Sequence, residues 1–296
     1  MDLGYCGLGR MGNAMALHLI DLGHRLTVWN RNPEKTRATA ERGAKVAASP
    51  QEVAAASEIV ITSLTNDAAV DSVYNGRDGL LAGGAKGKLF IETSTIKPSS
   101  MQALDAKVRA AGAALVECPV GGTVGPAREG KLLGCGGGSE ADYARAQPVL
   151  AQLCRRVERL GPIGAGSAFK LAINLPLVVY WEALGEALSL CRDAGIAPKL
   201  ALEIMQESSG GANALKNRAP KLLMALEGGA KPEVGFDVDG MRKDIGTMLA
   251  VAEAMGVRLP LIETARRCYD EAASAGLGSS DASSMAAFRV AQAKRS

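Results

Sequence analysis

Two polar side chains lie in an otherwise apolar stretch of the chain and could handle a proton. Lys170 and Asn174 are four residues apart, so a helix would place them on one face, among Leu171, Ala172 and Ile173. An amine in apolar surroundings is expected to have a lowered pKa, which suits proton exchange with an alcohol or a carbonyl near neutral pH. Asn174 could orient the hydroxyl and the lysine together, because an amide both donates and accepts hydrogen bonds.

Taken by themselves, these two residues do not establish catalysis. A lysine whose amine reaches the surface and a buried structural asparagine explain the same pattern better. Other acid–base groups are limited, since the sequence has two histidines, His18 and His24. Histidine-built metal sites and Ser-His-Asp triads are therefore not expected. We expect no metal, because the six cysteines form no CxxC pair and are interpreted as reduced core residues.

A glycine-rich motif near the N-terminus indicates a nucleotide site. The sequence GLGRMG at 7–12 is a GxGxxG that follows a predicted strand, opens a predicted helix and precedes a second strand at Rossmann spacing. Gly7 would permit the tight turn, Gly9 the approach of a pyrophosphate, and Gly12 close packing of helix on strand. A glycine-rich turn without a ligand is the alternative. The loop residues predicted to bind a dinucleotide are Gly7, Leu8, Gly9, Arg10, Met11 and Gly12.

The residues after the second strand favour NADP over NAD. An NAD enzyme usually has Asp or Glu at this point, where the carboxylate holds the ribose hydroxyls. Here residues 29–32 read Trp-Asn-Arg-Asn, and Lys35 follows. A carboxylate would repel the 2′-phosphate of NADP, whereas Arg31 could bind it bidentately. We predict that Asn30, Arg31 and Lys35 bind the cofactor and that NADPH is preferred over NADH. If Arg31 is only a surface charge, selectivity would be poor.

The elements that must position these groups divide the chain into two parts. In the first half, short apolar runs alternate with helical spacing, which predicts an α/β Rossmann domain with a doubly wound, mostly parallel sheet. Strands are predicted at 3–6, 25–29, 58–64, 88–92, 114–117, 131–135 and 156–160, with a helix at 11–22 that ends at Gly23. The glycine-rich stretches at 121–138 are interpreted as turns.

The second half shows helical patterns alone. A long helix at 167–194 is followed by helices at 198–208, 213–227, 239–256 and 260–275. We therefore predict an NADP-binding Rossmann domain at 1–164 and an all-α C-terminal substrate and dimerisation domain at 165–296, joined by the long helix.

Composition argues against several classes of protein. The net charge is +3 and aromatic residues make up 4%, so a nucleic-acid partner is not expected. The longest apolar stretch, 171–181, is shorter than the ~20 residues of a membrane span. The N-terminus lacks the pattern of a signal peptide. We expect a cytoplasmic protein without a membrane partner.

Six motifs in order resemble the β-hydroxyacid dehydrogenase family over nearly the whole chain. They are GLGRMG at 7–12, TSLTND at 62–67, ETST at 92–95, ECPVGG at 117–122, GAGSAFKLAIN at 164–174 and FDVDGMRKD at 236–244. This family includes 3-hydroxyisobutyrate dehydrogenase, tartronate semialdehyde reductase and glyoxylate/succinic semialdehyde reductase. The resemblance implies an NADP(H)-dependent oxidoreductase that interconverts a small β-hydroxy acid and its semialdehyde in a cleft between the two domains.

The resemblance also implies a role for each matching residue. Lys170 would be the acid–base residue, and Asn174 a substrate ligand. Asp244 would fix the segment that carries Lys243. The substrate-binding residues would be Gly121, Gly122, Thr123, Thr95 and Asn174, and further cofactor contacts would come from Leu64, Thr65, Thr95 and Lys243. A homodimer or homotetramer formed through the helical domain is implied as well.

The chain departs from the family pattern near the predicted site. The substrate loop usually reads DAPVSGG, but here Cys118 replaces the alanine, Gly121 the serine and Thr123 the last glycine. The identity of the acid or aldehyde substrate therefore stays open. Pro176 follows Asn174 and is expected to kink the long helix. In the last motif, Asp237 and Asp239 are expected to pair with Arg242.

Two other functions are less consistent with the sequence. An imine reductase would have a similar fold, but such enzymes usually have Asp or Tyr at the position of Lys170. A non-catalytic NADP-binding protein would typically have lost this lysine and gained extra segments. The chain has Lys170 and Asn174 and no appended module, so both alternatives are less favoured.

Overall fold

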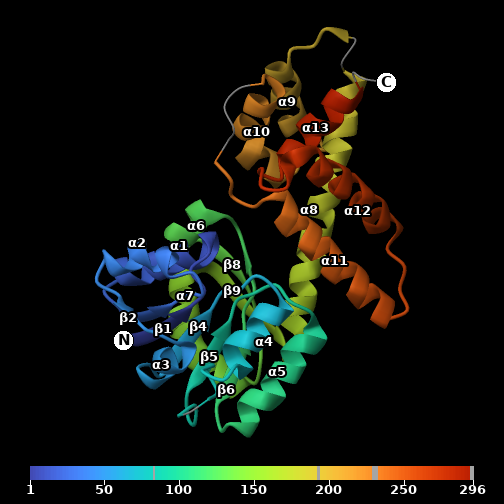
Figure 1. The fold of residues 1–296 in the computed structure, drawn as a ribbon. Coiled ribbons are helices and arrows are strands. Elements are labelled where there is room, and N and C mark those ends of the chain that lie inside the picture. Colours follow the sequence, from blue (N-terminus) through green and yellow to red (C-terminus); the bar gives the residue numbers. More distant parts are fainter. Residues whose placement is uncertain (83, 192–193, 229–232, 294–296) are drawn as a thin grey trace. The chain divides into compact units, whose positions relative to one another are not determined.

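The computed structural model of the chain consists of two compact units, Met1–Leu171 and Ala172–Ser296 (Figure 1). It describes residues 1–82, 84–191, 194–228 and 233–293. The division between the units falls inside helix α8 (Ala165–Leu190), whereas the boundary inferred from the sequence lies where this helix begins.

The first unit is built on one sheet that has nine strands among the described residues. Six neighbouring strands pair in parallel, in the order β3, β2, β1, β4, β5, β6. Strand β8 pairs antiparallel with β6 and β7 and parallel with β9. The mostly parallel, doubly wound sheet predicted from the sequence is confirmed. The strands are β1 (Asp2–Cys6), β2 (Arg25–Trp29), β3 (Lys45–Val46), β4 (Ile59–Thr62), β5 (Leu89–Glu92), β6 (Ala114–Glu117), β7 (Val120–Gly121), β8 (Leu132–Gly137) and β9 (Cys154–Gly161).

Helices cover both faces of this sheet. Successive side chains of a strand point to opposite faces, so strands buried on both sides consist of continuous apolar runs. Leu3 and Tyr5 of β1 face one layer of helices, whereas Cys6 faces the other. The first layer contains α1 (Arg10–Asp21), α6 (Val124–Arg128) and α7 (Glu140–Leu153), and the second contains α3 (Pro50–Ala55), α4 (Asp67–Asn75) and α5 (Pro98–Ala110). The 3-10 helix η1 (Pro33–Thr36) and α2 (Arg37–Ala40) follow β2.

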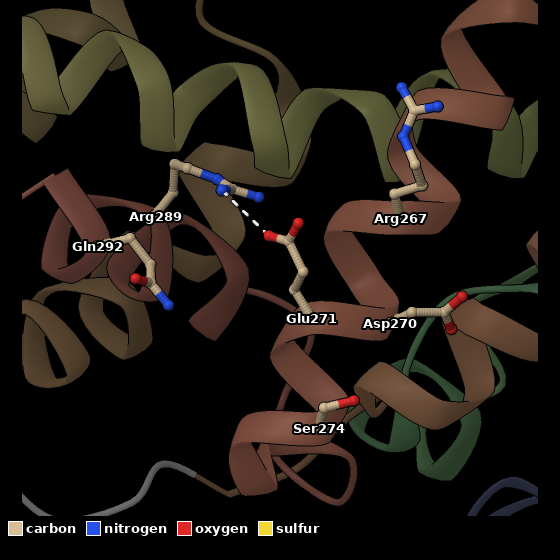
Figure 2. Close-up of a pocket in the computed structure, with 6 residues that line it drawn as sticks. All are labelled: Arg267, Asp270, Glu271, Ser274, Arg289 and Gln292. Atoms are coloured by element: carbon tan, nitrogen blue, oxygen red, sulfur yellow. Dashed lines mark hydrogen bonds and ion pairs between the residues drawn. The ribbon is translucent and has the colours of Figure 1, made fainter. Parts of the chain in front are cut away.

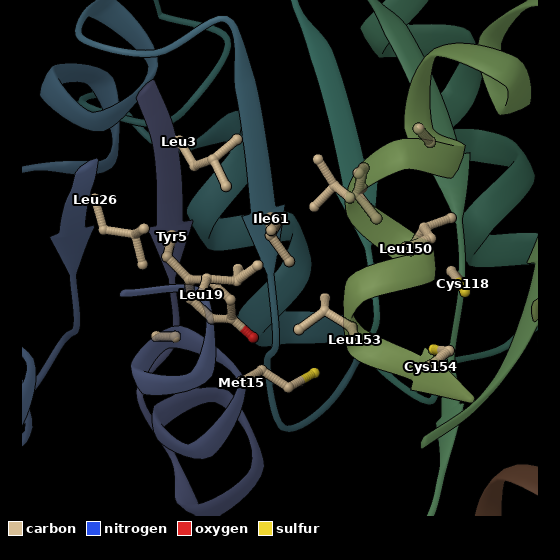
Figure 3. Close-up of a cluster of buried hydrophobic side chains, with 14 of the residues drawn as sticks. Leu3, Tyr5, Met15, Leu19, Leu26, Ile61, Cys118, Leu150, Leu153 and Cys154 are labelled. Carbon is tan, nitrogen blue, oxygen red and sulfur yellow. The ribbon is translucent and has the colours of Figure 1, made fainter. Parts of the chain in front are cut away.

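Figure 3 shows part of the first layer. Met15 and Leu19 of α1 and Leu153 of α7 are buried in one apolar cluster. Helix α1 ends as predicted, because Gly23 adopts a φ of +86° and the N–H of His24 bonds to the Leu19 carbonyl.

The predicted end of β8 is wrong. The glycines after Cys135 were expected to form a turn, but β8 continues through Gly137. A Cβ at Gly136 would collide with the ring of Tyr143, and one at Gly137 with the carboxylate of Glu117. Glycine is therefore needed at these positions, because neighbouring side chains lie close to the backbone. The thiols of Cys118 and Cys154, which Figure 3 shows, are likewise buried against Gly134.

The second unit is helical. It contains the part of α8 from Ala172 onward. The elements that follow are α9 (Pro198–Glu207), α10 (Asn213–Leu226), α11 (Val238–Ala254), α12 (Pro260–Ala272), the π-helix η3 (Ala273–Leu277) and α13 (Ser284–Ala293). The four predicted helices from 198 onward are confirmed to within a few residues, whereas α13 was not predicted. The predicted end of α8 at 194 is wrong, since the helix ends at Leu190. Residues 192–193 lie outside the described residues. The helix runs unbroken through Pro176.

The length and composition of helix α8 resemble those of a membrane span. Within the described ranges it is the one helix that is long and apolar enough to cross a membrane, with 26 residues and a mean hydropathy of 1.3 over its most apolar window. In this structure 44% of that window is buried. Core helices of soluble proteins share this property, so it is weak support for a membrane span.

Candidate active site

The glycine-rich loop joins β1 to α1 at the carboxyl end of the parallel strands. Gly7 has a φ of +97°, and a Cβ there would collide with the carbonyl of Ser63. A Cβ on Gly12 would collide with the carbonyl of Gly7, whereas one on Gly9 would meet no atom within 4 Å. The fold therefore requires the first and third glycines. The second leaves open space at the N-terminus of α1, which suits a phosphate group.

Asn30 is hydrogen-bonded to this loop. Its Oδ1 accepts a hydrogen bond from the N–H of Leu8 at 2.8 Å, and its Nδ2 donates one to the carbonyl of Asn32 at 2.8 Å. The side chain therefore shapes the loop from the end of β2. Arg31 is exposed two residues after the end of this strand, and Lys35 is exposed in η1.

The loops that follow β4 and β5 are tied together. The N–H of Leu64 donates a hydrogen bond to Oγ of Ser94 at 2.7 Å. Thr65 is exposed in the first loop, and Thr95 is half-buried in the second. The structure thus places three predicted cofactor contacts at the same edge of the sheet as the glycine-rich loop. Of the remaining loop side chains, Arg10 is exposed and Met11 is half-buried against the core.

A buried carboxylate lies beside these two loops. Glu92 ends β5, where Oε2 accepts a hydrogen bond from Oγ1 of Thr62 at 2.6 Å and Oε1 accepts one from the N–H of Ser94 at 2.8 Å. Burial raises the pKa of Glu92 from its ordinary value of 4.5 to about 7, because the ionised form loses its hydration. This carboxyl therefore changes charge near neutral pH.

The predicted substrate loop, which begins at Glu117, runs through β7. Gly122 has a φ of +134°, and a Cβ there would press on Leu132 at 2.7 Å, so glycine is required. Gly121 differs, because a Cβ there would make ordinary contacts, one of them 3.8 Å from Nζ of Lys170. The backbone therefore has room for a Cβ at this position, and glycine leaves that space beside the amine open. Thr123 is the N-cap residue of α6.

Lys170 lies near the start of α8, and 7% of the residue is exposed. The carboxylate of Glu117, at the end of β6, binds the beginning of this helix. It accepts hydrogen bonds from the N–H groups of Gly164 at 2.5 Å, Gly166 at 3.0 Å and Ser167 at 3.1 Å. The hydroxyl of Ser167 donates a fourth at 2.5 Å. Burial raises the pKa of Glu117, although these hydrogen bonds oppose the shift.

Neither Glu92 nor Glu117 was predicted from the sequence as an individual site residue. Both close an apolar strand, LFIE in β5 and ALVE in β6, and they lie opposite each other in the register of these strands. An acidic residue at the end of a fully buried strand was the available signal, because a buried carboxylate must find donors.

The second unit contains three residues with predicted roles, Asn174, Lys243 and Asp244. Nδ2 of Asn174 donates a hydrogen bond to Oδ2 of Asp244 at 2.7 Å, and both side chains are buried. Nζ of Lys243 lies 2.7 Å from Oδ1 of the same carboxylate. Asp244 therefore links the predicted substrate ligand to the predicted cofactor lysine.

The acidic residues at the start of α11 have different partners. Asp239 forms an ion pair with Arg242 at 2.9 Å, as expected. Asp237 caps the helix, since its Oδ1 accepts a hydrogen bond from the N–H of Gly240 at 2.8 Å.

A hollow of about 710 Å³ lies elsewhere in the second unit, at α12, η3 and α13 (Figure 2). Its charged residues already have partners. Arg289 bonds to Glu182 at 3.0 Å and pairs with Glu271 at 3.5 Å, the contact drawn in Figure 2. Asp270 pairs with Arg242 at 2.7 Å. This open hollow contains none of the predicted site residues.

Comparison with known proteins decides the family. A model for the NAD binding domain of 6-phosphogluconate dehydrogenase matches residues 2–161, and a model described as NAD-binding of NADP-dependent 3-hydroxyisobutyrate dehydrogenase matches residues 164–289. The 3-hydroxyisobutyrate dehydrogenase of Pseudomonas aeruginosa is 36% identical over 90% of this chain and 91% of its own length. The chain belongs to the β-hydroxyacid dehydrogenase family. It is accordingly an oxidoreductase with a pyridine-nucleotide-binding Rossmann domain.

Solved structures agree with the fold. A 3-hydroxyisobutyrate dehydrogenase of Mycobacterium tuberculosis, solved with L-serine, has a TM-score of 0.85 at 27% identity and covers 97% of this chain and 98% of its own. Psf3 in complex with NADP+ and 2-OPP has a TM-score of 0.86 at 25% identity, with 97% and 99% covered. Both structures match the chain over nearly its full length.

Proposed function

We propose that this protein is an NADP(H)-dependent oxidoreductase that interconverts a small β-hydroxy acid and its semialdehyde, with Lys170 as general acid and base. One observation carries the proposal: the amine of the buried Lys170 lies beside the backbone of Gly121, 3.8 Å from where a Cβ would stand. The name of the Pseudomonas aeruginosa relative supports a substrate like 3-hydroxyisobutyrate.

The residues at the carboxyl edge of the sheet fit a dinucleotide. The open space at Gly9 would receive the pyrophosphate at the N-terminus of α1. Arg31, exposed after β2, would pair with the 2′-phosphate, which is our reason for preferring NADP over NAD. Leu64, Thr65 and Thr95 would line the cofactor, and Lys243 would contact it. When bound, NADPH supplies the hydride.

The protein's own side chains and backbone groups transfer the proton and bind the substrate. Lys170, when protonated, donates a proton to the carbonyl oxygen of the substrate, and in the reverse direction its neutral amine accepts a proton from the hydroxyl. Backbone N–H groups at Gly121 and Gly122 would bind the carboxylate, and Thr123 would contribute its hydroxyl. Asn174, whose amide is held by Asp244, would bind a substrate oxygen.

We further propose that the protein forms a homodimer or homotetramer through its helical unit. Support comes from large apolar side chains that this unit leaves exposed: 88% of Leu190 and 60% of Ile204 are accessible. Light scattering coupled to size-exclusion chromatography measures the mass, and a monomer at micromolar concentration would contradict this assignment.

Oxidation of NADPH against a panel of small aldehydes tests the function. The panel contains 2-methyl-3-oxopropanoate, succinic semialdehyde, tartronate semialdehyde and glyoxylate, with cyclic imines as controls for the alternative chemistry. We expect turnover of at least one acid-bearing aldehyde and faster turnover with NADPH than with NADH. Reduction of the imines alone would refute the proposal.

A further inference from the structure

Glu117 is the most heavily bonded carboxylate near Lys170, and acid–base chemistry does not require it. It accepts four hydrogen bonds from the start of α8 and the residue before it, namely three from N–H groups and one from the hydroxyl of Ser167. N–H groups in the first turn of a helix have no partner within the helix, and a negative charge at this end is stabilised by the helix dipole. Glu117 therefore caps a helix of 26 residues from outside.

The surroundings allow this close approach. A Cβ at Gly137 would collide with Oε1 of Glu117, and one at Gly166 would collide with the carbonyl of Cys135. The two glycines thus permit the strand end and the helix start to meet around the carboxylate. Loss of these contacts would let the first turn of α8 move.

The same carboxylate stands at the start of the substrate loop. Gly121 follows Glu117 by four residues, and Lys170 follows Ser167 by three. A Cβ at Gly121 would lie 3.8 Å from Nζ of Lys170. The segment from Glu117 to Gly121 and the start of α8 therefore lie close together at two places, the Glu117 carboxylate and the Lys170 amine.

We propose that Glu117 is a positioning residue: its carboxylate fixes the first turn of α8 to the end of β6 and thereby sets where the Lys170 amine stands beside Gly121. This inference rests on the proposed function of Lys170. Glu117 acts through the lysine, because each of its four bonds is made to α8 or the residue before it.

A double-mutant cycle on turnover tests this relationship. Glu117→Gln keeps the shape but replaces one accepting oxygen with an NH₂ group, which cannot accept from the helix. We expect kcat to fall on the order of tenfold or more through misplacement of the amine, while the Kd for NADPH stays within about twofold. In a Lys170→Ala background the loss should shrink to less than about twofold, because no amine remains to be positioned.

Two further variants are compared with Glu117→Gln. Glu92→Gln removes a second buried carboxylate, one that bonds to Thr62 and Ser94 and not to α8, so any loss it causes should persist in the Lys170→Ala background. Ser167→Ala removes one of the four donors and keeps the carboxylate. It should reproduce the Glu117→Gln pattern at smaller amplitude, which keeps the test open if Glu117→Gln folds poorly.

A measurement without substrate separates this inference from the proposed function. Acetylation by trace acetic anhydride, read for each lysine by mass spectrometry from pH 6 to 10, reports the reactivity of Lys170. We expect Glu117→Gln to change the rate at Lys170 about threefold or more and to leave the exposed Lys107 and Lys131 unchanged. If this shift occurs while no aldehyde is turned over, the proposed function fails and the positioning role stands. An unchanged rate at Lys170, or an equal loss of kcat with and without Lys170, would overturn the positioning role.

Discussion

The side-chain amide of Asn174 donates a hydrogen bond to the carboxylate of Asp244, and both side chains are buried in the helical unit. These residues are 70 positions apart, in α8 and α11. The bond fixes the orientation of the amide, because Nδ2 must face the carboxylate and Oδ1 is then directed elsewhere. Asp244 also pairs with Lys243 at 2.7 Å, so one carboxylate organises two predicted ligands.

Removing this carboxylate should destabilise the protein and impair catalysis. Asp244→Ala leaves the amide of Asn174 without its buried acceptor, which typically costs about 1–3 kcal/mol. We expect urea denaturation to show a loss of this size and the KM for substrate to rise. Asp239→Ala is the matched control, since Asp239 lies in the same helix but its side chain is 57% exposed in its ion pair. It should cost at most about 1 kcal/mol, and equal losses would contradict a special role for Asp244.

The glycine-rich loop offers a variant that separates binding from folding. A Cβ on Gly9 meets no atom within 4 Å, so Gly9→Ala should melt within about 2 °C of the wild type. It should nevertheless weaken NADPH binding on the order of tenfold, because the methyl group occupies space that the pyrophosphate needs. Fluorescence titration of NADPH measures the Kd. Unchanged affinity would place the phosphate elsewhere.

Arg31 should decide between the two nicotinamide cofactors. Arg31→Ala removes the exposed guanidinium after β2, and a charge-assisted contact to phosphate is worth about 1.5–3 kcal/mol. We expect kcat/KM for NADPH to fall on the order of tenfold to a hundredfold while that for NADH is retained. Arg37→Ala, which removes a neighbouring exposed arginine paired with Glu41, is the control. An NADPH/NADH ratio that stays the same in Arg31→Ala would show that the assignment is wrong.

Glu92 should make stability depend on pH. Its pKa is raised by burial from 4.5 to about 7, so between these values the folded protein holds more protons than the unfolded chain. Stability contributed by this group is therefore complete below pH 4.5 and is lost as pH rises to about 7, with a total of roughly 3 kcal/mol.

Urea denaturation at intervals from pH 4.5 to 8 measures this dependence. Glu92→Gln should flatten the decline, because its side chain does not titrate in this range. Glu129→Gln serves as the control, since Glu129 is exposed and Lys131 holds its pKa below the ordinary value. If Glu92→Gln and the wild type decline in parallel, the carboxyl of Glu92 is ionised throughout the range.

Local patterns predicted the sheet, most helices and the glycine-rich loop, since each depends on the spacing of neighbouring residues. The contacts that hold the site depend on residues far apart in the chain. Glu117 meets Gly164 across 47 positions, and Asn174 meets Asp244 across 70. Nothing in the local sequence specifies such a partner. The glycines of β8 were misread for the same reason, because their role depends on Tyr143 and Glu117, which pack against them only in the fold.

The central claim is that Lys170 exchanges the proton with substrate, and the variant Lys170→Ala tests it most directly. With the best aldehyde from the panel, kcat of this variant should be measured beside the Kd for NADPH. We predict that kcat falls on the order of a hundredfold or more, as expected for loss of acid–base catalysis, while the Kd for NADPH stays within about twofold. Turnover near the wild-type rate would contradict the account and exclude Lys170 as the proton donor.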